Sequence, residues 1–291
     1  MADEILPEIM ATGCLPQPIS TRTGIDLYTG VMIPPEQYRS TRVMARYVPR
    51  GKCQSSVPAC NWYSTLKAYQ TVFAMRTGKP YPELSYCANY QIDTNGNFDA
   101  GTMPLESIRQ ITRDGIVPVG PGLPEWFNQP RQIPPELMKR RSLFRGLGWE
   151  ECRTGAQVIS AILNTDPVNI GIDWMSEDVN PGPTGFLGVG GRIIDGHSVL
   201  AIGVEMGYHL SPSRIGIVFS NHHGDKLTPA FQDERGNQLK FPVWGDDGIG
   251  IVPIERVQAG IVKYGSFSLR SIMLTSDMLG DLPAPIFTAA A

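Results

Sequence analysis

The sequence predicts an α+β fold built from two packed lobes. From Trp62 to Phe73 apolar residues recur at spacings of three and four, which is the period of a helix. Val168, Ile170 and Ile172 alternate with polar or small residues, which is the period of a half-buried strand. Because helical patterns come first and strand patterns follow, we expect a helical lobe in the N-terminal half and an antiparallel β-sheet or barrel lobe in the C-terminal half.

Local signals predict the individual elements. The first helix covers about 62–77, starting just after Pro58-Ala59-Cys60 and stopping at Gly78. A second helix is predicted over 104–113, because Pro104 lies at an early helical position and Gly115 lies past its end. A third is predicted over about 154–163. Strands are predicted over 168–173, 197–205, 214–220, 248–254 and 266–274.

Length and composition indicate one large domain or two small ones. The chain has 291 residues, of which 42% are hydrophobic, and this is enough for a well-filled core. Residues 1–50 are rich in Pro, Thr and Arg and show little periodicity, so we expect an extended arm that packs on the body. The body is predicted to span 51–275, and residues 276–291 form a C-terminal tail that is apolar at its end.

Charge and cysteine content argue against several function classes. The net charge of −3 and the lack of a basic run beyond 139–141 argue against nucleic acid as a partner. No stretch of about 18 apolar residues is present, so neither a membrane span nor a signal peptide is expected. The five cysteines lack Cys-x-x-Cys spacing, which argues against a disulfide framework and a zinc site. We therefore expect a non-secreted, cytoplasmic protein in a reducing compartment, without metal or cofactor.

One ordered set of residues points to a chemical activity. Gln54 lies six positions before Cys60, and His197 and Asn221 follow far along the chain. A thiol becomes a good nucleophile as a thiolate, which a helix N-terminus and a neighbouring imidazolium both favour. Cys60 is predicted at the first turn of a helix, and His197 can supply the imidazole. A cysteine and a histidine that are distant in sequence but joined by the fold are typical of a cysteine hydrolase.

A series of segments resembles the papain-like cysteine protease family over roughly residues 50–255. Each segment alone is a weak signal, but together they stand in the order that the family has. The resemblance implies a two-lobed fold with the active site in the cleft between the lobes, in a divergent and non-secreted member. The segments are 54–64, 84–85 with 96–104, 114–116, 166–173, 197–203, 221–224 and 244–249.

The resemblance also implies a role for each residue of the set. Cys60 would attack a peptide carbonyl, His197 would accept and return the proton, and Asn221 would orient the imidazole. The side-chain amide of Gln54 would form an oxyanion hole with the main-chain N–H of Cys60. The substrate would lie against four further residues, Ala100, Gly101, Gly196 and His223.

Several positions depart from the family pattern. Val57 stands where secreted members often have a disulfide cysteine, which agrees with a chain that is not exported. Asn61 follows the nucleophile where the family usually has Trp, and His223 replaces the Trp that shields the His–Asn pair. We therefore expect a wetter pair of His197 and Asn221 with a weaker hydrogen bond. An inhibitory pro-segment is not evident, because the first 50 residues lack a long helical pattern.

Each residue of the set has an ordinary structural explanation as well. Taken alone, Cys60 would be a packing residue, His197 a strand histidine and Asn221 a turn residue. The neighbours His222 and His223 invite a metal interpretation, but adjacent strand side chains point to opposite faces, so a shared ion is not expected. An insertion between Gly224 and Trp244, and a glycine-rich loop over 185–191 that no helix follows, could border the cleft.

Functions of different classes fit these patterns. The first is a cysteine-type endopeptidase that hydrolyses peptide or protein substrates. The second is a papain-fold structural or binding component of a larger assembly, such as a viral particle, which the arm and the tail would join to protein partners. Acyl transfer or amidase chemistry on the same cysteine is a third possibility, because the nucleophile does not dictate the acceptor.

Overall fold

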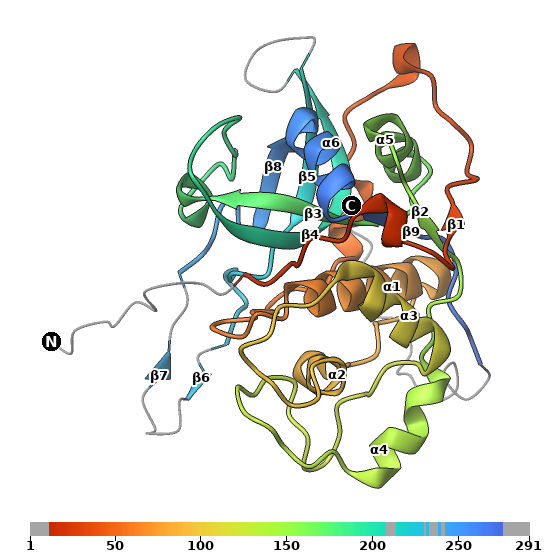
Figure 1. Ribbon diagram of the computed structural model, residues 1–291, viewed down its shortest axis with the longest axis vertical. Helices are drawn as coiled ribbons and strands as arrows, with labels where there is room; N and C mark the ends of the chain where they lie inside the picture. The colour runs from red at the N-terminus through yellow and green to blue at the C-terminus, as the bar shows by residue number, and fades with distance from the viewer. Residues whose placement is uncertain (1–11, 208–213, 230, 233–237, 240–241, 276–291) are drawn as a thin grey trace, which may run out of the picture.

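The protein is an α+β structure in which a sheet packs on a group of helices, as the sequence predicts. The computed structural model describes residues 12–207, 214–229, 231–232, 238–239 and 242–275. Figure 1 shows the larger sheet with α5 and α6 on one side of the molecule, and α1, α2, α3 and α4 on the other. None of the described helices is long and apolar enough to cross a membrane. The predicted tail over 276–291 lies outside the described residues.

Six α-helices occur in the described part of the chain, and the sequence patterns predicted three of them. The predicted helices are α1 (Cys60–Thr77), α3 (Pro104–Arg113) and α5 (Gly155–Leu163), the last with a capping box formed by Thr154 and Gln157. The helices that were not predicted are α2 (Tyr86–Asp93), α4 (Pro135–Arg140) and α6 (Ile254–Lys263). Short 3-10 turns are η1 (Ile19–Thr21), η2 (Pro35–Gln37), η3 (Val43–Tyr47), η4 (Arg141–Leu143) and η5 (Ser176–Val179).

The sheet is mixed, because one pair at its edge is parallel and the other pairs are antiparallel. Its seven strands lie in the order β1-β2-β9-β3-β4-β5-β8. They are β1 (Asp26–Leu27), β2 (Trp149–Glu151), β9 (Ser266–Leu269), β3 (Val168–Met175), β4 (Ile193–Met206), β5 (Ile215–Ser220) and β8 (Ile249–Pro253). The predicted strand over 266–274 ends at Leu269. A separate pair, β6 (Phe231–Gln232) and β7 (Gln238–Leu239), lies within the predicted insertion.

Helix α1 is the central element of the molecule. Its residues from Cys60 to Ala74 are all buried, and it contacts β4 on one side and both α2 and α3 on the other. A helix that is buried on every side has no solvent face. Its polar residues, and not only those of its apolar stripe, therefore contact other parts of the protein. The buried polar residues Lys67 and Gln70 therefore need partners inside the protein.

Residues 12–50 form an irregular arm that packs along the body. The arm adds β1 to the sheet edge, and Thr41 pairs with Val204 of β4. Arg22 fastens it, because its guanidinium lies 3.1 Å from the Glu151 carboxylate and both side chains are fully buried. The same guanidinium donates to the carbonyl oxygens of Gln17, Ile261 and Val262.

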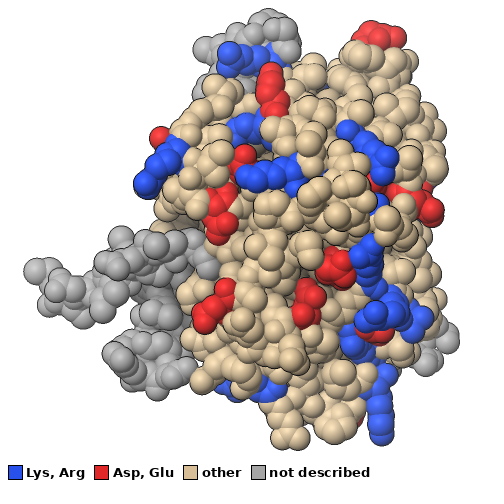
Figure 2. Space-filling view, viewed as in Figure 1, with Lys and Arg blue, Asp and Glu red and all other residues tan. Residues whose placement is uncertain are grey.

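The surface view in Figure 2 shows basic and acidic side chains interspersed on one face of the molecule. Nothing on that face resembles the continuous basic stripe of a nucleic-acid-binding protein. The expectation that nucleic acid is not a partner stays a prediction.

Replacing Arg22 with Met should detach the arm from the body. Glu151 would keep a buried charge with one fewer partner, and breaking a buried pair costs roughly 3–5 kcal/mol. We expect lower unfolding free energy in urea and faster protease cleavage within the arm. Arg153→Met is the matched control, because Arg153 binds the same carboxylate from a side chain that is 42% exposed, and it should cost under about 1 kcal/mol. Equal effects of the two substitutions would contradict this account.

Candidate active site

Cys60 is the first residue of α1 and is completely buried against β4. Its sulfur accepts hydrogen bonds from the main-chain N–H groups of Ser198, Asn61 and Gly13. Burial nevertheless raises the pKa of the Cys60 thiol from 9.0 to about 12, because the desolvation cost exceeds the gain from these donors. A shift of that size corresponds to about 4 kcal/mol, whereas a helix N-terminus contributes about 1 kcal/mol. In this state Cys60 is a thiol, and not the thiolate that the helix start alone would suggest.

His197 lies on β4 directly before Ser198, whose main-chain N–H donates to the Cys60 sulfur. Its Nε2 is 2.9 Å from Oδ1 of Asn221, which also accepts the main-chain N–H of His222 at 2.9 Å. An oxygen that accepts from both groups requires the proton of the neutral imidazole to be on Nε2. The Nδ1 atom then carries a lone pair, and it has no hydrogen-bond partner among the described residues.

The pair of His197 and Asn221 is dry, so the expectation of a wetter pair is wrong. The rings of Trp174, His223 and His222 lie with centroids 4.4, 4.6 and 4.8 Å from that of His197. Trp174 of β3 supplies the shield that the sequence seemed to lack at position 223. Burial lowers the pKa of His197 from 6.5 to about 4, although the Asn221 hydrogen bond opposes this shift.

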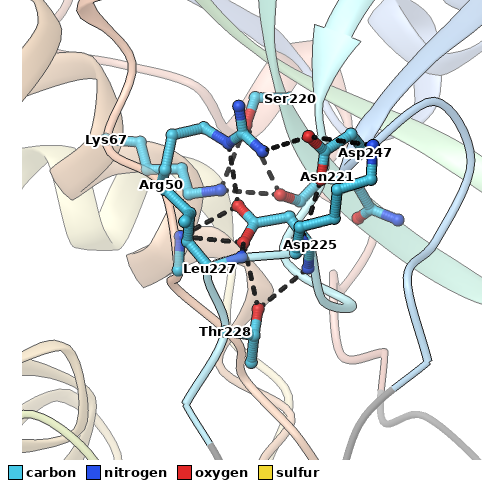
Figure 3. A network of polar contacts seen from close by, with 10 residues as sticks. Arg50, Lys67, Ser220, Asn221, Asp225, Leu227, Thr228 and Asp247 are labelled. Carbon is cyan, nitrogen blue, oxygen red and sulfur yellow. Dashed lines mark hydrogen bonds and ion pairs between the residues drawn. The ribbon is translucent and has the colours of Figure 1, made fainter.

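Lys67 connects the helix of the nucleophile to the orienting asparagine. It lies on α1 two turns after Cys60, and its Nζ donates to the carbonyl oxygen of Asn221 at 2.6 Å and to Oγ of Ser220 at 3.1 Å (Figure 3). Burial lowers the pKa of Lys67 from 10.5 to about 8. The side chain thus holds α1 and the end of β5 at a fixed separation.

Gln54 is also buried and lies beside the Asn221 segment. Its main-chain N–H donates to the carbonyl of His222 at 2.9 Å, and its side-chain Nε2 donates to the carbonyl of Val57 at 3.1 Å. One amide hydrogen is therefore engaged within the turn that precedes α1. This bond fixes the Gln54 side chain beside the start of α1.

A charged network fastens the Gln54 segment to the loop that follows Asn221. The carboxylate of Asp225 accepts from the Arg50 guanidinium at 3.0 Å and from the Gly51 N–H at 2.9 Å (Figure 3). The same arginine lies 2.8 Å from Asp247. These bonds join residues 50–51, which precede Gln54, to the loop that follows Asn221 and to Asp247.

The main chain of the arm lies against Gly101 and Gly196, two of the residues predicted to bind substrate. The N–H groups of Gly13 and Cys14 donate to the Gly196 carbonyl at 3.2 and 3.0 Å. On the opposite side, the Thr102 N–H donates to the Gly13 carbonyl at 2.8 Å, and the Leu15 N–H donates to the Thr102 carbonyl at 2.9 Å. The sequence showed no pro-segment, yet residues 13–15 cover Cys60 in this structure.

Glycines allow this close approach of two backbones. A Cβ at Gly101 would lie 2.8 Å from the Gly13 oxygen, and one at Gly196 would lie 2.2 Å from the Cys14 oxygen. A Cβ at Gly13 would lie 2.5 Å from the Pro58 oxygen. All three distances are shorter than a real side chain tolerates, so the cleft accepts an extended main chain at these points and little more.

The remaining predicted site residues are placed differently. Ala100 is partly buried, and its carbonyl accepts from the Tyr90 hydroxyl at 2.6 Å. His223 is fully buried, and its ring contacts those of Trp174, Trp244 and His197, so it belongs to the shield of His197. No group of three or more His, Cys, Asp or Glu residues in the described part could hold a metal ion.

The sequence patterns missed Lys67, Trp174 and the arm residues. A lysine on a helix with apolar residues around it was the available signal for Lys67, since such a residue must find buried partners. Trp174 lies just after the predicted strand over 168–173 and gave no signal of its own. The arm could not be placed, because its contacts are main-chain hydrogen bonds that any residue can make.

Replacing Lys67 with Met should remove the pH-dependent free-energy cost of burying the Lys67 ammonium group. Between about pH 8 and about pH 10.5 the unfolded chain binds more protons at Lys67 than the folded chain does, so raising the pH relieves the folded state. We expect the difference in unfolding free energy between Lys67→Met and wild type to shift in favour of wild type across this range. Lys139→Met, at an exposed position, is the control for losing one lysine. A difference that stays constant with pH would contradict the buried cation.

Replacing Gly13 with Val should open the cleft. The new side chain would collide with Pro58, so the arm would leave Cys60 and the thiol would regain a pKa closer to 9.0. We expect iodoacetamide to alkylate Cys60 at least about tenfold faster near pH 8, since each pKa unit changes the thiolate fraction about tenfold. Thr23→Val places the same side chain at an exposed arm position and should leave the rate unchanged. Equal rates in all three proteins would show that the arm does not protect Cys60.

Neither a protein-family model nor a curated protein sequence matches the chain. The structure is similar to that of xylellain, a cysteine protease from Xylella fastidiosa, with 13% identity, a TM-score of 0.65, and coverage of 90% of this chain and 96% of that chain.

Two further solved structures extend the likeness. Digestive procathepsin L 3 of Tenebrio molitor has 15% identity and a TM-score of 0.61, and the match covers 90% of this chain and 76% of that one. The ragweed pollen allergen Amb a 11, a cysteine protease in its proform, has 15% identity and a TM-score of 0.59, with coverage of 82% and 68%. At such identities a structural likeness establishes architecture. The chain therefore has the papain-like cysteine protease fold.

Proposed function

We propose that the protein is a cysteine-type endopeptidase that uses Cys60 as nucleophile and His197 as base. The observation that carries this proposal is the hydrogen bond of 2.9 Å between Asn221 and His197, which lies on the strand whose Ser198 N–H donates to Cys60. That bond leaves Nδ1 of His197 as a basic atom without a hydrogen-bond partner among the described residues. A structural histidine gains nothing from such an arrangement, because a buried unpaired nitrogen costs stability.

The reaction would begin once the arm has left the cleft. Cys60 would transfer its proton to Nδ1 of His197, and the sulfur would attack the peptide carbonyl carbon. The resulting oxyanion would accept from the side-chain amide of Gln54 and from the main-chain N–H of Cys60. His197 would return the proton to the leaving amine and then take one from water, which hydrolyses the thioester and frees Cys60.

A peptide or protein substrate suits the groups that line the cleft. The Gly196 carbonyl and both main-chain groups of Thr102 bind an extended backbone, which here belongs to residues 13–15. A substrate would take over these hydrogen bonds after displacing the arm. Side chains contribute little to these contacts, so the main chain of the substrate would provide the common part of recognition.

A second candidate function follows from the covered cleft. With a thiol and a neutral imidazole under the arm, the isolated chain can be inert and serve as a binding component of a larger assembly, for example a viral particle. In that case the arm and the C-terminal tail would contact protein partners. For both functions we propose a reducing, non-secretory setting, which the five free cysteines support.

Labelling with an epoxide selective for papain-like enzymes would test the peptidase proposal. We expect stoichiometric labelling at Cys60, mapped by mass spectrometry, in the Gly13→Val protein. Adding His197→Ala should abolish it and reduce peptide hydrolysis by about 100-fold or more, the usual contribution of a positioned base. Asn221→Ala should give a smaller loss, because the ring is then present but not oriented.

Two results would count against the peptidase. Equal labelling with and without His197 would show that the thiol reacts without a base. A well-folded Gly13→Val protein in which Cys60 is alkylated by iodoacetamide but neither takes the epoxide nor hydrolyses peptides would favour the binding component.

A further inference from the structure

A second cysteine lies next to the candidate nucleophile. Cys14 of the arm, Cys60 and Tyr264 form one cluster of buried contacting residues, and the two cysteines interact electrostatically. The Cys14 thiol also accepts a hydrogen bond from the side chain of Asn61, the residue directly after the nucleophile. The same side-chain amide donates to the Thr102 carbonyl. Asn61, which departs from the family pattern, thus binds the arm.

The arm holds Cys14 in this position from both sides. Main-chain hydrogen bonds join Gly13, Cys14 and Leu15 to Gly196 and Thr102, as described above. Behind them, the Thr12 hydroxyl bonds to the Asp195 carboxylate, and the Gln17 N–H donates to the Lys263 carbonyl at 2.8 Å. The Cys14 thiol is therefore presented to Cys60 by a fixed backbone.

We propose that Cys14 is a resolving cysteine for Cys60, and that a low-molecular-weight disulfide such as oxidised glutathione converts the two thiols into a Cys14–Cys60 disulfide. The disulfide joins the arm covalently to the nucleophile and closes the cleft. The disulfide would regulate the site of the proposed peptidase. The proposal rests on that function only in requiring Cys60 to react as a thiolate when the arm lifts.

The chemistry balances in two exchange steps. The Cys60 thiolate attacks one sulfur of oxidised glutathione, forms a mixed disulfide and releases one glutathione. When the arm returns, the deprotonated Cys14 sulfur attacks the Cys60 sulfur, and the second glutathione leaves and takes up the proton. Two protein thiols are oxidised to one disulfide while one glutathione disulfide is reduced to two thiols.

Burial explains why the first step waits for the arm. Under the arm both thiols have raised pKa values, chiefly from desolvation, so neither is a nucleophile. Lifting the arm hydrates Cys60 and lets His197 take its proton. The first oxidation therefore occurs in the open form and the second in the closing one, which stops Cys60 before irreversible oxidation.

The other cysteines are placed away from this pair. Cys53 and Cys87 both lie near Tyr63, and Cys152 interacts with Ser268 of β9. All five cysteines are described and free, and Cys14 alone among them shares a buried cluster with Cys60. The geometry thus selects one partner.

Peptide mapping of wild-type protein after treatment with oxidised glutathione tests the proposal. The full-length protein is incubated, trapped with acid, alkylated and digested without reductant. We expect one cross-linked pair of peptides that contains Cys14 and Cys60, together with loss of epoxide labelling and its full return with dithiothreitol. In Cys14→Ser the link should be absent, and Cys60 should instead accumulate as the glutathione mixed disulfide.

The result that overturns the proposal is a wild-type protein in which Cys60 remains a glutathione adduct, links to another cysteine or does not react at all. Failure of the peptidase proposal looks different. If the cross-link forms but the reduced protein with a displaced arm hydrolyses no peptide, the Cys14–Cys60 disulfide is supported and the peptidase function is refuted. If the reduced protein hydrolyses peptides but no cross-link forms, the peptidase function is supported and the disulfide proposal is refuted.

Discussion

The packing of α1 against β4 is the constraint on which the site depends. The helix brings Cys60 to the strand, and the strand supplies the Ser198 N–H to the sulfur and carries His197 as the preceding residue. Because α1 is buried on every side, each polar group that it carries has to be satisfied internally. Lys67 meets this requirement by binding the carbonyl of Asn221, so the need to bury a helix also fixes the distance to the orienting residue.

Exclusion of water determines the protonation states of Cys60 and His197 in this structure. Three N–H donors and a helix start favour a negative sulfur, yet the pKa of Cys60 is about 12, and the pKa of His197 is about 4. Both shifts favour neutral groups, since each charge alone loses its hydration when the arm covers the cleft. In the proposed peptidase the same residues would form an ion pair once water or a polar substrate replaces the arm.

Sequence patterns predicted the parts of the structure that rest on local signals. Neighbouring residues determine the period of α1, the start of α3 at Pro104 and the alternation in β3. The order of Cys60, His197 and Asn221 could be compared with that of a known family. Helix α6 was missed because it follows β8 without a turn. The shield over His197 was predicted wrongly, because Trp174, which is distant in the chain, packs on the imidazole together with His223.

The contacts of the arm could not be predicted from the sequence, for a different reason. Main-chain groups of residues 13–15 form them, and such groups carry no residue-specific signal. The glycines at 13, 101 and 196 were visible in the sequence, but a glycine can serve a turn, a bulge or a close approach. Only the fold shows that these three face one another across the same cleft.

The anchoring of the arm at Arg22 has a consequence for how the cleft is kept closed. A short tether of a few residues joins this buried ion pair to Cys14, so the covering segment never diffuses away. Linkers of this kind produce effective local concentrations on the order of millimolar. Occupancy of the cleft is then independent of protein concentration, and dilution, which dissociates an inhibitor bound from outside, leaves it unchanged. A competing peptide has to match that local concentration before it reaches Cys60.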